Sequence, residues 1–313
     1  MSTKIYEKNK YYLTPNRGLR HIVQLIFFIL LNGVLIGLTA FWLILPINQP
    51  PGPTSVSDGA LYILTDQAIH VIFPFIPIAS FLIFGSLLGK TLCGWVCPMG
   101  FIQDILILIS PFRKVYPSKS TNEAWSDVGK IFALTLIIFS AFIGLGKLAG
   151  GEEGLFGIEQ SLGVFAEDPL AILDPASTLL AYFPFLIVNE NVPILQTNAD
   201  LFGGIISLNW DIWWFWAKVL FLVGILIISM FIPRAFCRYV CPTGAVMSPI
   251  SEHAILGINR NLATCNQCLA CEAICPTGVR ILDHPERLRD PMCINCVDCV
   301  GVCDTGALTI KIN

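Results

Sequence analysis

The chain has 313 residues, of which 55% are hydrophobic and only 13% are charged, and its formal net charge is −3. Soluble domains average about a quarter charged residues, so this deficit favours a membrane protein. The slightly negative charge supplies no basic surface of the kind that binds DNA or RNA, so nucleic acid is excluded as an expected partner.

Four apolar stretches are long enough to cross a bilayer, which takes about 20 helical residues. They are Ile22–Leu45, Ile69–Gly89, Val128–Ala149 and Ile212–Ile232. The first is too long for a signal peptide, and no small-residue cleavage site follows it, so we interpret it as an uncleaved anchor. The pattern predicts an α-helical polytopic membrane domain with four spans.

Lysine and arginine are distributed unevenly among the connecting segments. Basic residues occupy the tail 1–21, the connection between spans two and three, and the segment after span four, whereas Pro46–Ala68 and Leu148–Ala217 have none. By the positive-inside rule, we expect both termini in the cytoplasm of a prokaryote and these two loops outside its inner membrane. Short apolar segments in the second loop, Ser177–Val188 and Ala199–Leu208, predict re-entrant or interfacial helices on the outer leaflet, and a role in lining a substrate site is the second alternative.

An internal repeat joins spans two and four to similar sequences. Span two leads into Lys90-TLCGWVCPMGFIQDI, and span four leads into Arg234-AFCRYVCPTGAVMSP. Each unit comprises a membrane helix, a basic residue, a Cys-x3-Cys-Pro pair and a short apolar helix. Two such units in the same orientation predict a pseudo-two-fold axis along the membrane normal, with both cysteine pairs at the cytoplasmic interface.

The pairs Cys93/Cys97 and Cys237/Cys241 leave several interpretations open. Proline favours the first position of a helix, so Cys97 and Cys241 are expected to cap helix N-termini, where the helix dipole lowers a thiol pKa. The four thiols could share a third metal centre, bind copper or cycle through a disulfide. The plainer alternative is a structural turn on which the C-terminal part of the chain docks.

Eight further cysteines form two Cys-x2-Cys-x2-Cys-x3-Cys runs near the C-terminus. This spacing is typical of a bacterial two-cluster ferredoxin, in which the fourth cysteine of each run binds the cluster of the other run. Zinc usually uses paired Cys-x2-Cys knuckles, and disulfides are disfavoured in the cytoplasm. We therefore predict two [4Fe–4S] clusters. The expected ligands are Cys265, Cys268, Cys271 and Cys303 for cluster 1, and Cys293, Cys296, Cys299 and Cys275 for cluster 2.

Three other side chains are candidates for a quinone site. His70 begins span two, His21 precedes span one, and Asp104 follows the first cysteine pair. A histidine can hydrogen-bond a quinone oxygen or relay a proton, although an interfacial histidine more often meets lipid headgroups. Asp104 is either a proton acceptor or part of the polar face of an interfacial helix.

The four spans, the sequences CGWVCPMG and CRYVCPTGA, and the two-cluster runs together resemble the NapH/MauN group of ferredoxin-type membrane proteins. The membrane cores of NosR and CcoG are similar, and the resemblance covers nearly the whole chain from about Arg17. It implies quinol oxidation in the membrane and delivery of electrons to a periplasmic reductase system. NosR-like proteins add an outer flavin-binding domain and CcoG-like proteins a C-terminal domain. We expect neither here, so NapH is the closest match by architecture.

The expected domains are a cytoplasmic tail (1–21), a membrane domain (22–258) and a small α+β ferredoxin module (259–313). The expected function is electron transfer from membrane quinol to other redox subunits, as a NapH-like quinol dehydrogenase component embedded in lipid. Two alternatives stay open. One is a metallocentre assembly factor that handles copper or reduces a disulfide, and the other is a membrane anchor that docks a soluble redox partner.

Overall fold

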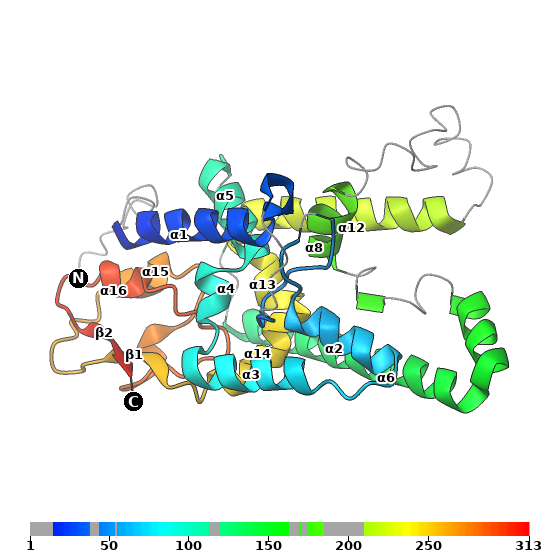
Figure 1. The fold of residues 1–313 in the computed structure, drawn as a ribbon. Helices are drawn as coiled ribbons and strands as arrows, with labels where there is room; N and C mark the ends of the chain where they lie inside the picture. The colour runs from blue at the N-terminus through cyan, green and yellow to red at the C-terminus, as the bar shows by residue number, and fades with distance from the viewer. Residues whose placement is uncertain are drawn as a thin grey trace.

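The computed structural model describes residues 15–37, 44–53, 55–112, 115, 119–162, 169–170, 174–184 and 210–312. Within these ranges the chain is mostly helical, with one small two-stranded sheet (Figure 1). The long helices run roughly along one direction and form an elongated body, and the sheet lies at one end of it (Figure 1). The part of the chain with the sheet is the predicted ferredoxin region, called the module below.

The elements follow the order that the repeat predicts. The first part of the chain contains α1 (Pro15–Leu31), the 3-10 turn η2 (Gly33–Ile36), α2 (Ala60–Ile69), α3 (Phe75–Leu88), α4 (Thr91–Trp95) and α5 (Pro98–Ile109). The second part contains α6 (Lys119–Leu162), α8 (Pro175–Ser177), the π-helical turn η4 (Thr178–Tyr182), α12 (Trp210–Phe231), α13 (Ala235–Tyr239) and α14 (Pro242–Ser251). The module contains β1 (Leu256–Arg260), α15 (Ala270–Ile274), the 3-10 turn η5 (Ile281–Asp283), α16 (Asp298–Gly301) and β2 (Leu308–Ile312). The series α3–α4–α5 and α12–α13–α14 are therefore equivalent.

One stretch in the described part of the chain, Ser120–Gly150 within α6, is long and apolar enough to cross a membrane. It contains the third predicted span. Only 33% of its most apolar window is buried inside the protein, whereas the core helix of a soluble protein would be buried on its apolar face. The other predicted spans coincide with shorter described helices. Four membrane spans therefore remain a prediction.

The second predicted span is not one continuous helix, so this part of the prediction is wrong. α2 ends at Ile69 and α3 begins only at Phe75. Pro74 disfavours the helical conformation in the residue before it, and Val71 adopts a left-handed backbone with φ 58°. The first span also differs, because α1 begins at Pro15 and ends at Leu31, while residues 38–43 lie outside the described ranges.

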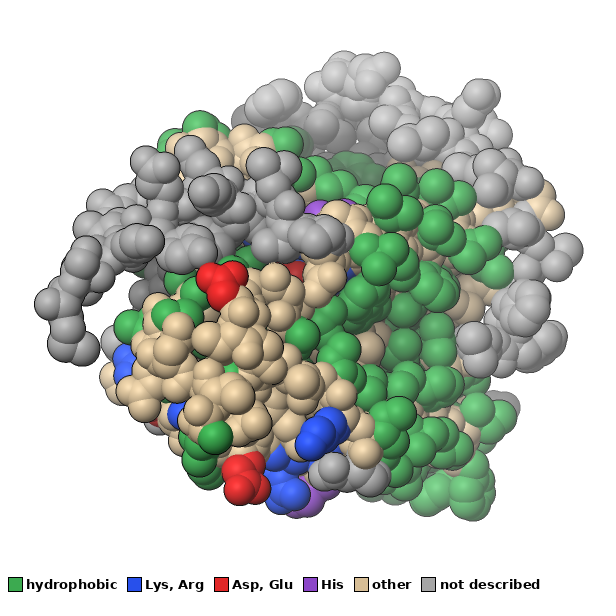
Figure 2. All heavy atoms as spheres, turned by 90° about the vertical axis from the view of Figure 1, so that its left-hand side faces the viewer, with side chains coloured by type: hydrophobic (Ala, Val, Ile, Leu, Met, Phe, Trp, Pro, Cys, Tyr) green, Lys and Arg blue, Asp and Glu red, His purple; other side chains and the backbone are tan. Residues whose placement is uncertain are grey.

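Apolar side chains cover much of the helical surface. Figure 2, seen from the end with the module, shows them along one flank, whereas backbone and uncharged other side chains, with a few charged residues, cover most of the module. Exposed examples from α1, α3, α6 and α12 are Leu25, Ile29, Leu82, Ile131, Phe142 and Leu220. Soluble proteins rarely expose apolar patches larger than a few hundred Å², so this surface favours contact with lipid.

Segments of both predicted outer loops reach into the core. Ile47 from the first loop and Ala176 and Leu180 from the second are buried in one apolar cluster with Cys97 and Cys241. The described part of Ser177–Val188 is therefore inserted among the helices, which favours the re-entrant over the interfacial alternative. Ala199–Leu208 lies outside the described residues.

The two repeats exchange packing partners. The helix α12 of the second repeat lies on α5 of the first, where Ser110 Oγ donates to Met230 O at 2.8 Å. In the matching arrangement, α3 of the first repeat lies on α14 of the second, and a Cβ added at Gly85 would lie 2.6 Å from Ile250 Cγ2. Each repeat thus packs its long helix on the short helix of the other.

The module is built on a two-stranded antiparallel sheet. β1 pairs with β2 so that Ile258 lies opposite Ile310. Ile258, Val279, Ile281 and Leu308 are buried together with the cysteine side chains. The sheet joins the segment that precedes the first cysteine run to the segment that follows the second, so it closes the module around both runs.

Candidate iron–sulfur sites

The two ferredoxin runs share one backbone conformation. The residues on both sides of the second cysteine are left-handed in each run: Gln267 (φ 55°) and Leu269 (φ 63°) in the first, Asn295 (φ 48°) and Val297 (φ 57°) in the second. Such a conformation costs a non-glycine residue roughly 1–3 kcal/mol. Its repetition at matching positions indicates two loops that are shaped for the same task. A short helix, α15 or α16, follows each loop and precedes the fourth cysteine.

The predicted ligands of cluster 1 lie around one cavity. Cys265, Cys268 and Cys271 come from the first run and Cys303 from the end of the second, and all four line the same pocket. Residues from both strands complete its wall. Cys268 is exposed, so this set of cysteines lies at the surface of the module, where an external redox protein can approach.

The predicted ligands of cluster 2 gather on the inner side of the module. They are Cys275, Cys293, Cys296 and Cys299. These thiols lie within electrostatic reach of one another, although one of them comes from the other run. The backbone N–H of Val279 donates to Cys275 Sγ at 3.4 Å. Cys299 also lies within electrostatic reach of Cys271, so the two sets are adjacent.

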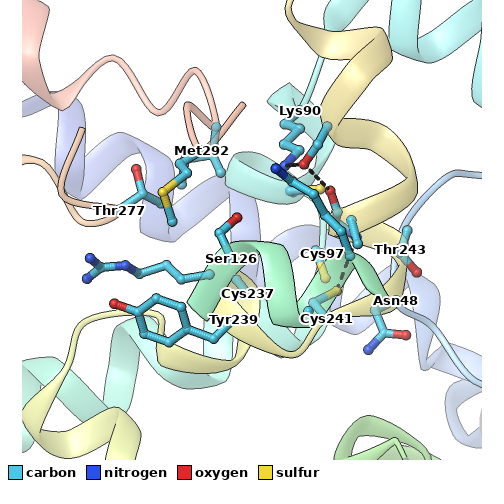
Figure 3. A pocket seen from close by; sticks show the side chains of 18 residues that line it. Asn48, Lys90, Cys97, Ser126, Cys237, Tyr239, Cys241, Thr243, Thr277 and Met292 are labelled. Carbon is cyan, nitrogen blue, oxygen red and sulfur yellow. Dashed lines mark hydrogen bonds between the residues drawn. The ribbon is translucent and has the colours of Figure 1, made fainter. Parts of the chain in front are cut away.

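The four cysteines of the two repeats line one further cavity, here called the four-cysteine cavity (Figure 3). Cys93 lies on α4 and Cys237 on α13, while Cys97 and Cys241 are the N-caps of α5 and α14, which confirms the predicted caps. Both thiols of the second pair lie within electrostatic reach of both thiols of the first. The fold therefore joins two pairs that are far apart in the chain.

The expected lowering of the thiol pKa is wrong. Burial raises the pKa of Cys93 to about 11 and that of Cys237 to about 12, and it also raises the pKa of Cys97 and of Cys241. The loss of water around a thiolate outweighs the helix N-termini and the nearby guanidinium of Arg234. Neutral thiols therefore line the cavity at neutral pH, and a bound cation would be needed to ionise them.

Each repeat reaches across to the other with its basic residue. Lys90 precedes α4 and Arg234 precedes α13, at matching positions of the two repeats. Lys90 Nζ donates to Ser248 Oγ at 2.7 Å, and Arg234 Nε donates to Asp104 Oδ1 at 2.9 Å. Ser248 and Asp104 also occupy matching positions. The two contacts thus have the two-fold relation that the repeat predicts.

Asp104 lies at the centre of a buried ionic network. Besides Arg234, its carboxylate accepts a hydrogen bond from Gln24 Nε2 at 3.1 Å and pairs with Arg20 at 3.4 Å. Burial alone would raise the pKa of Asp104, but the guanidiniums of Arg234 and Arg20 outweigh it and hold the pKa well below its usual range. The carboxylate is therefore ionised and fully engaged, and neither sequence interpretation anticipated this role.

The helix α1 connects this network to the module. Arg20 also pairs with Asp298 at 3.3 Å, and Arg17 pairs with the same carboxylate at 3.0 Å. Asp298 begins α16, between two predicted ligands of cluster 2, and is fully buried. Arg20 thereby places a positive charge beside Cys296. Such a charge favours the reduced state of a nearby cluster.

The backbone of α4 touches the second ferredoxin run. A Cβ added at Gly94 would lie 2.6 Å from Ile294 O and 3.8 Å from Cys296 Cα, so only glycine permits this approach. Trp95 Nε1 donates to Asn295 O at 3.1 Å in the same loop. Because the residue before Gly94 is a cysteine of the four-cysteine cavity, this cavity and the ligands of cluster 2 lie on either side of one backbone contact.

The two candidate histidines lie in different surroundings. His21 Nδ1 is 3.0 Å from Gln24 Oε1, and Gln24 in turn binds Asp104, so His21 adjoins the ionic network. His70 is exposed at the end of α2, where its Nδ1 lies 3.4 Å from Asp66 Oδ1. The structure therefore does not bring the three candidates for a quinone site together.

Two residues of the four-cysteine cavity carried no recognisable sequence signal. Asn48 comes from the first predicted outer loop, and Thr243 from the first turn of α14. Both line the cavity and are 1% exposed. Within the described ranges, the side-chain atoms Nδ2 and Oδ1 of Asn48 and Oγ1 of Thr243 have no hydrogen-bond partner. A single asparagine in a loop and a threonine after a proline match no motif.

The two repeats match a family that is described as "4Fe-4S binding domain", over residues 69–116 and 213–259. One family thus matches both units, which supports the internal repeat. The cysteines within the matched ranges are Cys93, Cys97, Cys237 and Cys241. The matched domain therefore includes the four-cysteine cavity and precedes the two ferredoxin runs.

Three curated proteins illustrate what the chain is similar to. An uncharacterized protein of Methanocaldococcus jannaschii is 26% identical over 226 residues, which are 72% of this chain and 73% of that protein. The putative electron transport protein YccM of Escherichia coli is 24% identical over 204 residues, 65% of this chain and 46% of YccM. The regulatory protein NosR of Stutzerimonas stutzeri is 26% identical over 214 residues, 68% of this chain and 23% of NosR.

The chain therefore corresponds to less than half of YccM and to about a quarter of NosR. No solved structure matches it. The domain description, the electron-transport relative and the grouped cysteines of the module together support iron–sulfur electron transfer.

Proposed function

We propose that this chain is a NapH-like quinol dehydrogenase component, which passes electrons from membrane quinol through iron–sulfur clusters to other redox proteins. The observation that carries the proposal is the arrangement of the eight ferredoxin cysteines in two interleaved sets, one exposed and one facing the helical body. A chain of two centres can accept electrons on the donor side and deliver them at the surface where the partner approaches, and this order of the two sets suits such a path.

The residues fit two [4Fe–4S] clusters with the predicted ligands. Cys265, Cys268, Cys271 and Cys303 would hold cluster 1, and Cys275, Cys293, Cys296 and Cys299 would hold cluster 2. The repeated left-handed loops, the N–H of Val279 at Cys275 Sγ and the exclusively thiol donor set support this assignment. Each cluster supplies one-electron chemistry, while Arg17 and Arg20 hold the module against α1 and place positive charge beside cluster 2.

We also propose a multi-pass arrangement in the inner membrane, with the four predicted spans and both termini in the cytoplasm. The unequal distribution of lysine and arginine and the exposed apolar side chains of α1, α3, α6 and α12 support it. Reporter fusions after residues 58, 116 and 313 test it. We expect periplasmic activity only after residue 58.

Quinol oxidation releases two electrons and two protons per molecule, and bound clusters would supply the one-electron chemistry that this requires. The pair His70–Asp66 is the best placed of the candidates to accept a proton, because it is exposed and adjoins an exposed apolar run. This run consists of Val71, Ile72, Phe73, Phe75 and Ile76. An apolar surface beside a proton acceptor suits a quinol headgroup with an isoprenoid tail.

The test uses the full-length protein with its clusters, in detergent or nanodiscs. Addition of a menaquinol or ubiquinol analogue should reduce the clusters, as seen by bleaching of their visible absorption and by EPR. The variant Cys296→Ser should lose the response of cluster 2, and His70→Ala should slow it without loss of iron. Clusters that are reduced by dithionite but not by either quinol would refute the dehydrogenase and leave the docking anchor.

The four-cysteine cavity specifically favours one alternative, a metallocentre assembly factor. Four buried thiols are a suitable donor set for Cu(I) as well as for iron. Stoichiometric copper in the protein isolated from copper-supplemented cells, lost in Cys93→Ser with Cys237→Ser while quinol oxidation persists, would favour this function. Unchanged low copper in both proteins would exclude copper handling by this cavity.

A further inference from the structure

Two polar side chains in the lining of the four-cysteine cavity have no hydrogen-bond partner among the residues that the structure describes. Asn48 and Thr243 line the same cavity as Cys97 and Cys241, and Figure 3 shows these four residues near one another. Leaving a buried hydrogen-bonding group without a partner costs about 1–3 kcal/mol. Two such side chains at one cavity therefore indicate a bound group with which they form hydrogen bonds.

Other donors already point at the sulfur atoms. Gln103 Nε2 donates to Cys237 Sγ at 3.1 Å, and the backbone N–H of Gly244 donates to Cys241 Sγ at 3.4 Å. Hydrogen bonds to sulfur ligands tune and stabilise iron–sulfur clusters. The backbone N–H of Val279 approaches Cys275 Sγ in the same way within the module. The cavity thus resembles the predicted cluster sites in its donors as well as in its cysteines.

The spacing of the thiols favours a cluster over a single ion. Because a zinc–sulfur bond is about 2.3 Å long, one tetrahedral ion brings its four sulfur atoms within about 4 Å of each other. A cubane separates them further, because each cysteine binds a different corner. Among the residues that the structure describes, no three Cys, His, Asp or Glu side chains gather closely enough to hold one metal ion. This holds at the four-cysteine cavity and at the eight ferredoxin cysteines alike, so both sites are compatible with the wider spacing of a cluster.

We propose that the four-cysteine cavity holds a third [4Fe–4S] cluster, ligated by Cys93, Cys97, Cys237 and Cys241 and hydrogen-bonded by Asn48 and Thr243. This inference rests on the proposed electron-transfer function and extends its path. The Gly94 backbone contact joins the third site to cluster 2.

The position of the third site has a consequence for the direction of the path. Ile47 and Ala176, from the re-entrant segments of both predicted outer loops, share an apolar cluster with two of the cavity cysteines. Electrons at this site are therefore closer to the predicted outer side than electrons in the module. The third cluster connects the cytoplasmic module with donors or acceptors deeper in the membrane domain.

Iron, acid-labile sulfide and EPR spin counts on the full-length protein test the inference. Three cubanes give about 12 iron atoms and, after full reduction, about three spins per chain, whereas two cubanes give about 8 iron atoms and two spins. The variant Cys93→Ser with Cys237→Ser should lose about a third of the iron and one spin. The control Cys265→Ser with Cys268→Ser should lose the same amount of iron but a different EPR component.

Hydrogen-bond variants test the same site without removing a ligand. Asn48→Val and Thr243→Val should lower the midpoint potential of one EPR component and leave the other two unchanged, because hydrogen bonds to sulfur stabilise the reduced cluster. The control is Thr65→Val, a buried threonine that bonds its own helix and does not line the cavity. Equal shifts of all components in the cavity variants would indicate a general structural effect and overturn the assignment.

A wild-type count of about 8 iron atoms with two spins overturns the third cluster, even if quinol reduces the other two. One equivalent of zinc or copper at the cavity, or a disulfide between its cysteines, also overturns it. The count involves no quinol, so failure of quinol oxidation would refute the proposed function and leave the third cluster standing.

Discussion

The variant Asp104→Asn tests whether the buried ionic network holds the two repeats together. Asp104 is 3% exposed, and the two guanidiniums that it engages, Arg20 and Arg234, are 1% and 0% exposed. Arg20 keeps Asp298 as an anionic partner in the variant. Arg234 keeps only uncharged acceptors, which are the amide oxygen of the new asparagine and backbone carbonyls of α4 such as Cys93 O at 3.1 Å. The substitution therefore leaves one fully buried cation without an anion.

Removing one partner of a buried ion pair costs about 3–5 kcal/mol, because the remaining charge is uncompensated. We expect a loss of this size in the free energy of unfolding, out of a total of about 5–15 kcal/mol. Unfolding of the full chain in mixed micelles with increasing dodecyl sulfate, followed by tryptophan fluorescence, measures it. Release of iron followed in the same titration shows whether the module separates with the network.

The repeat supplies a matched control. Ser248→Ala removes the equivalent contact on the other side, but Lys90 Nζ keeps Pro291 O as an acceptor at 2.5 Å. Loss of one such hydrogen bond costs about 0.5–1.5 kcal/mol. If Asp104→Asn destabilises the protein no more than Ser248→Ala, the network does not hold the repeats together and our reasoning is wrong.

Three further variants test the contacts around the clusters. Gly94→Ala should slow electron transfer between cluster 2 and the membrane domain several-fold at unchanged iron content, because the new methyl group pushes against Ile294 O. Stopped-flow measurement of the rate at which quinol reduces the clusters tests this. Cys275→Ser should alter the same EPR component as Cys293→Ser, because the two cysteines belong to one predicted set. Trp95→Phe should lose a hydrogen bond worth about 1 kcal/mol and make the module more susceptible to limited proteolysis.

Each variant has its own control and its own contrary result. Gly224→Ala adds a methyl group to α12 in open space and should leave the transfer rate unchanged, and an equal slowing in both glycine variants would discredit the contact as the cause. Cys268→Ser should alter the other component, so a common spectrum for all three cysteine variants would disprove the interleaved ligand sets. A proteolysis pattern in Trp95→Phe identical to that of the wild type would show that the indole contact does not secure the module.

The sequence predicted best what depends on local spacing. The ferredoxin runs, the caps at Cys97 and Cys241 and the internal repeat all follow from residues that lie close together in the chain. The convergence of the two pairs on one cavity could not be predicted, because it depends on how the helices of the two repeats exchange partners. The same exchange places Asn48 beside the cavity, although the residues next to it in the sequence predict an outer loop.

Two of the sequence predictions were wrong because burial is not visible in the sequence. Asp104 resembles the polar residue of an interfacial helix until Arg20 and Arg234, from two distant helices, are placed against it. The thiol pKa was expected to fall because the helix N-termini are visible in the sequence, whereas the removal of water around Cys93 and Cys237 is not. Pro74 and Pro77 predict a kink in the second span, but not the full break between Ile69 and Phe75, because hydropathy averages over it.

The exchanged contacts of the two repeats constrain how such a protein can evolve. A duplicated ancestor would have carried the same basic–polar contact twice. Here one copy is an ion pair, Arg234–Asp104, and the other is a neutral hydrogen bond, Lys90–Ser248. The first pair can change only if both positions change together, although 130 residues separate them, whereas the second tolerates single substitutions. In sequences related to this chain, substitutions at such contact positions should therefore covary between the first and the second repeat and not within one repeat.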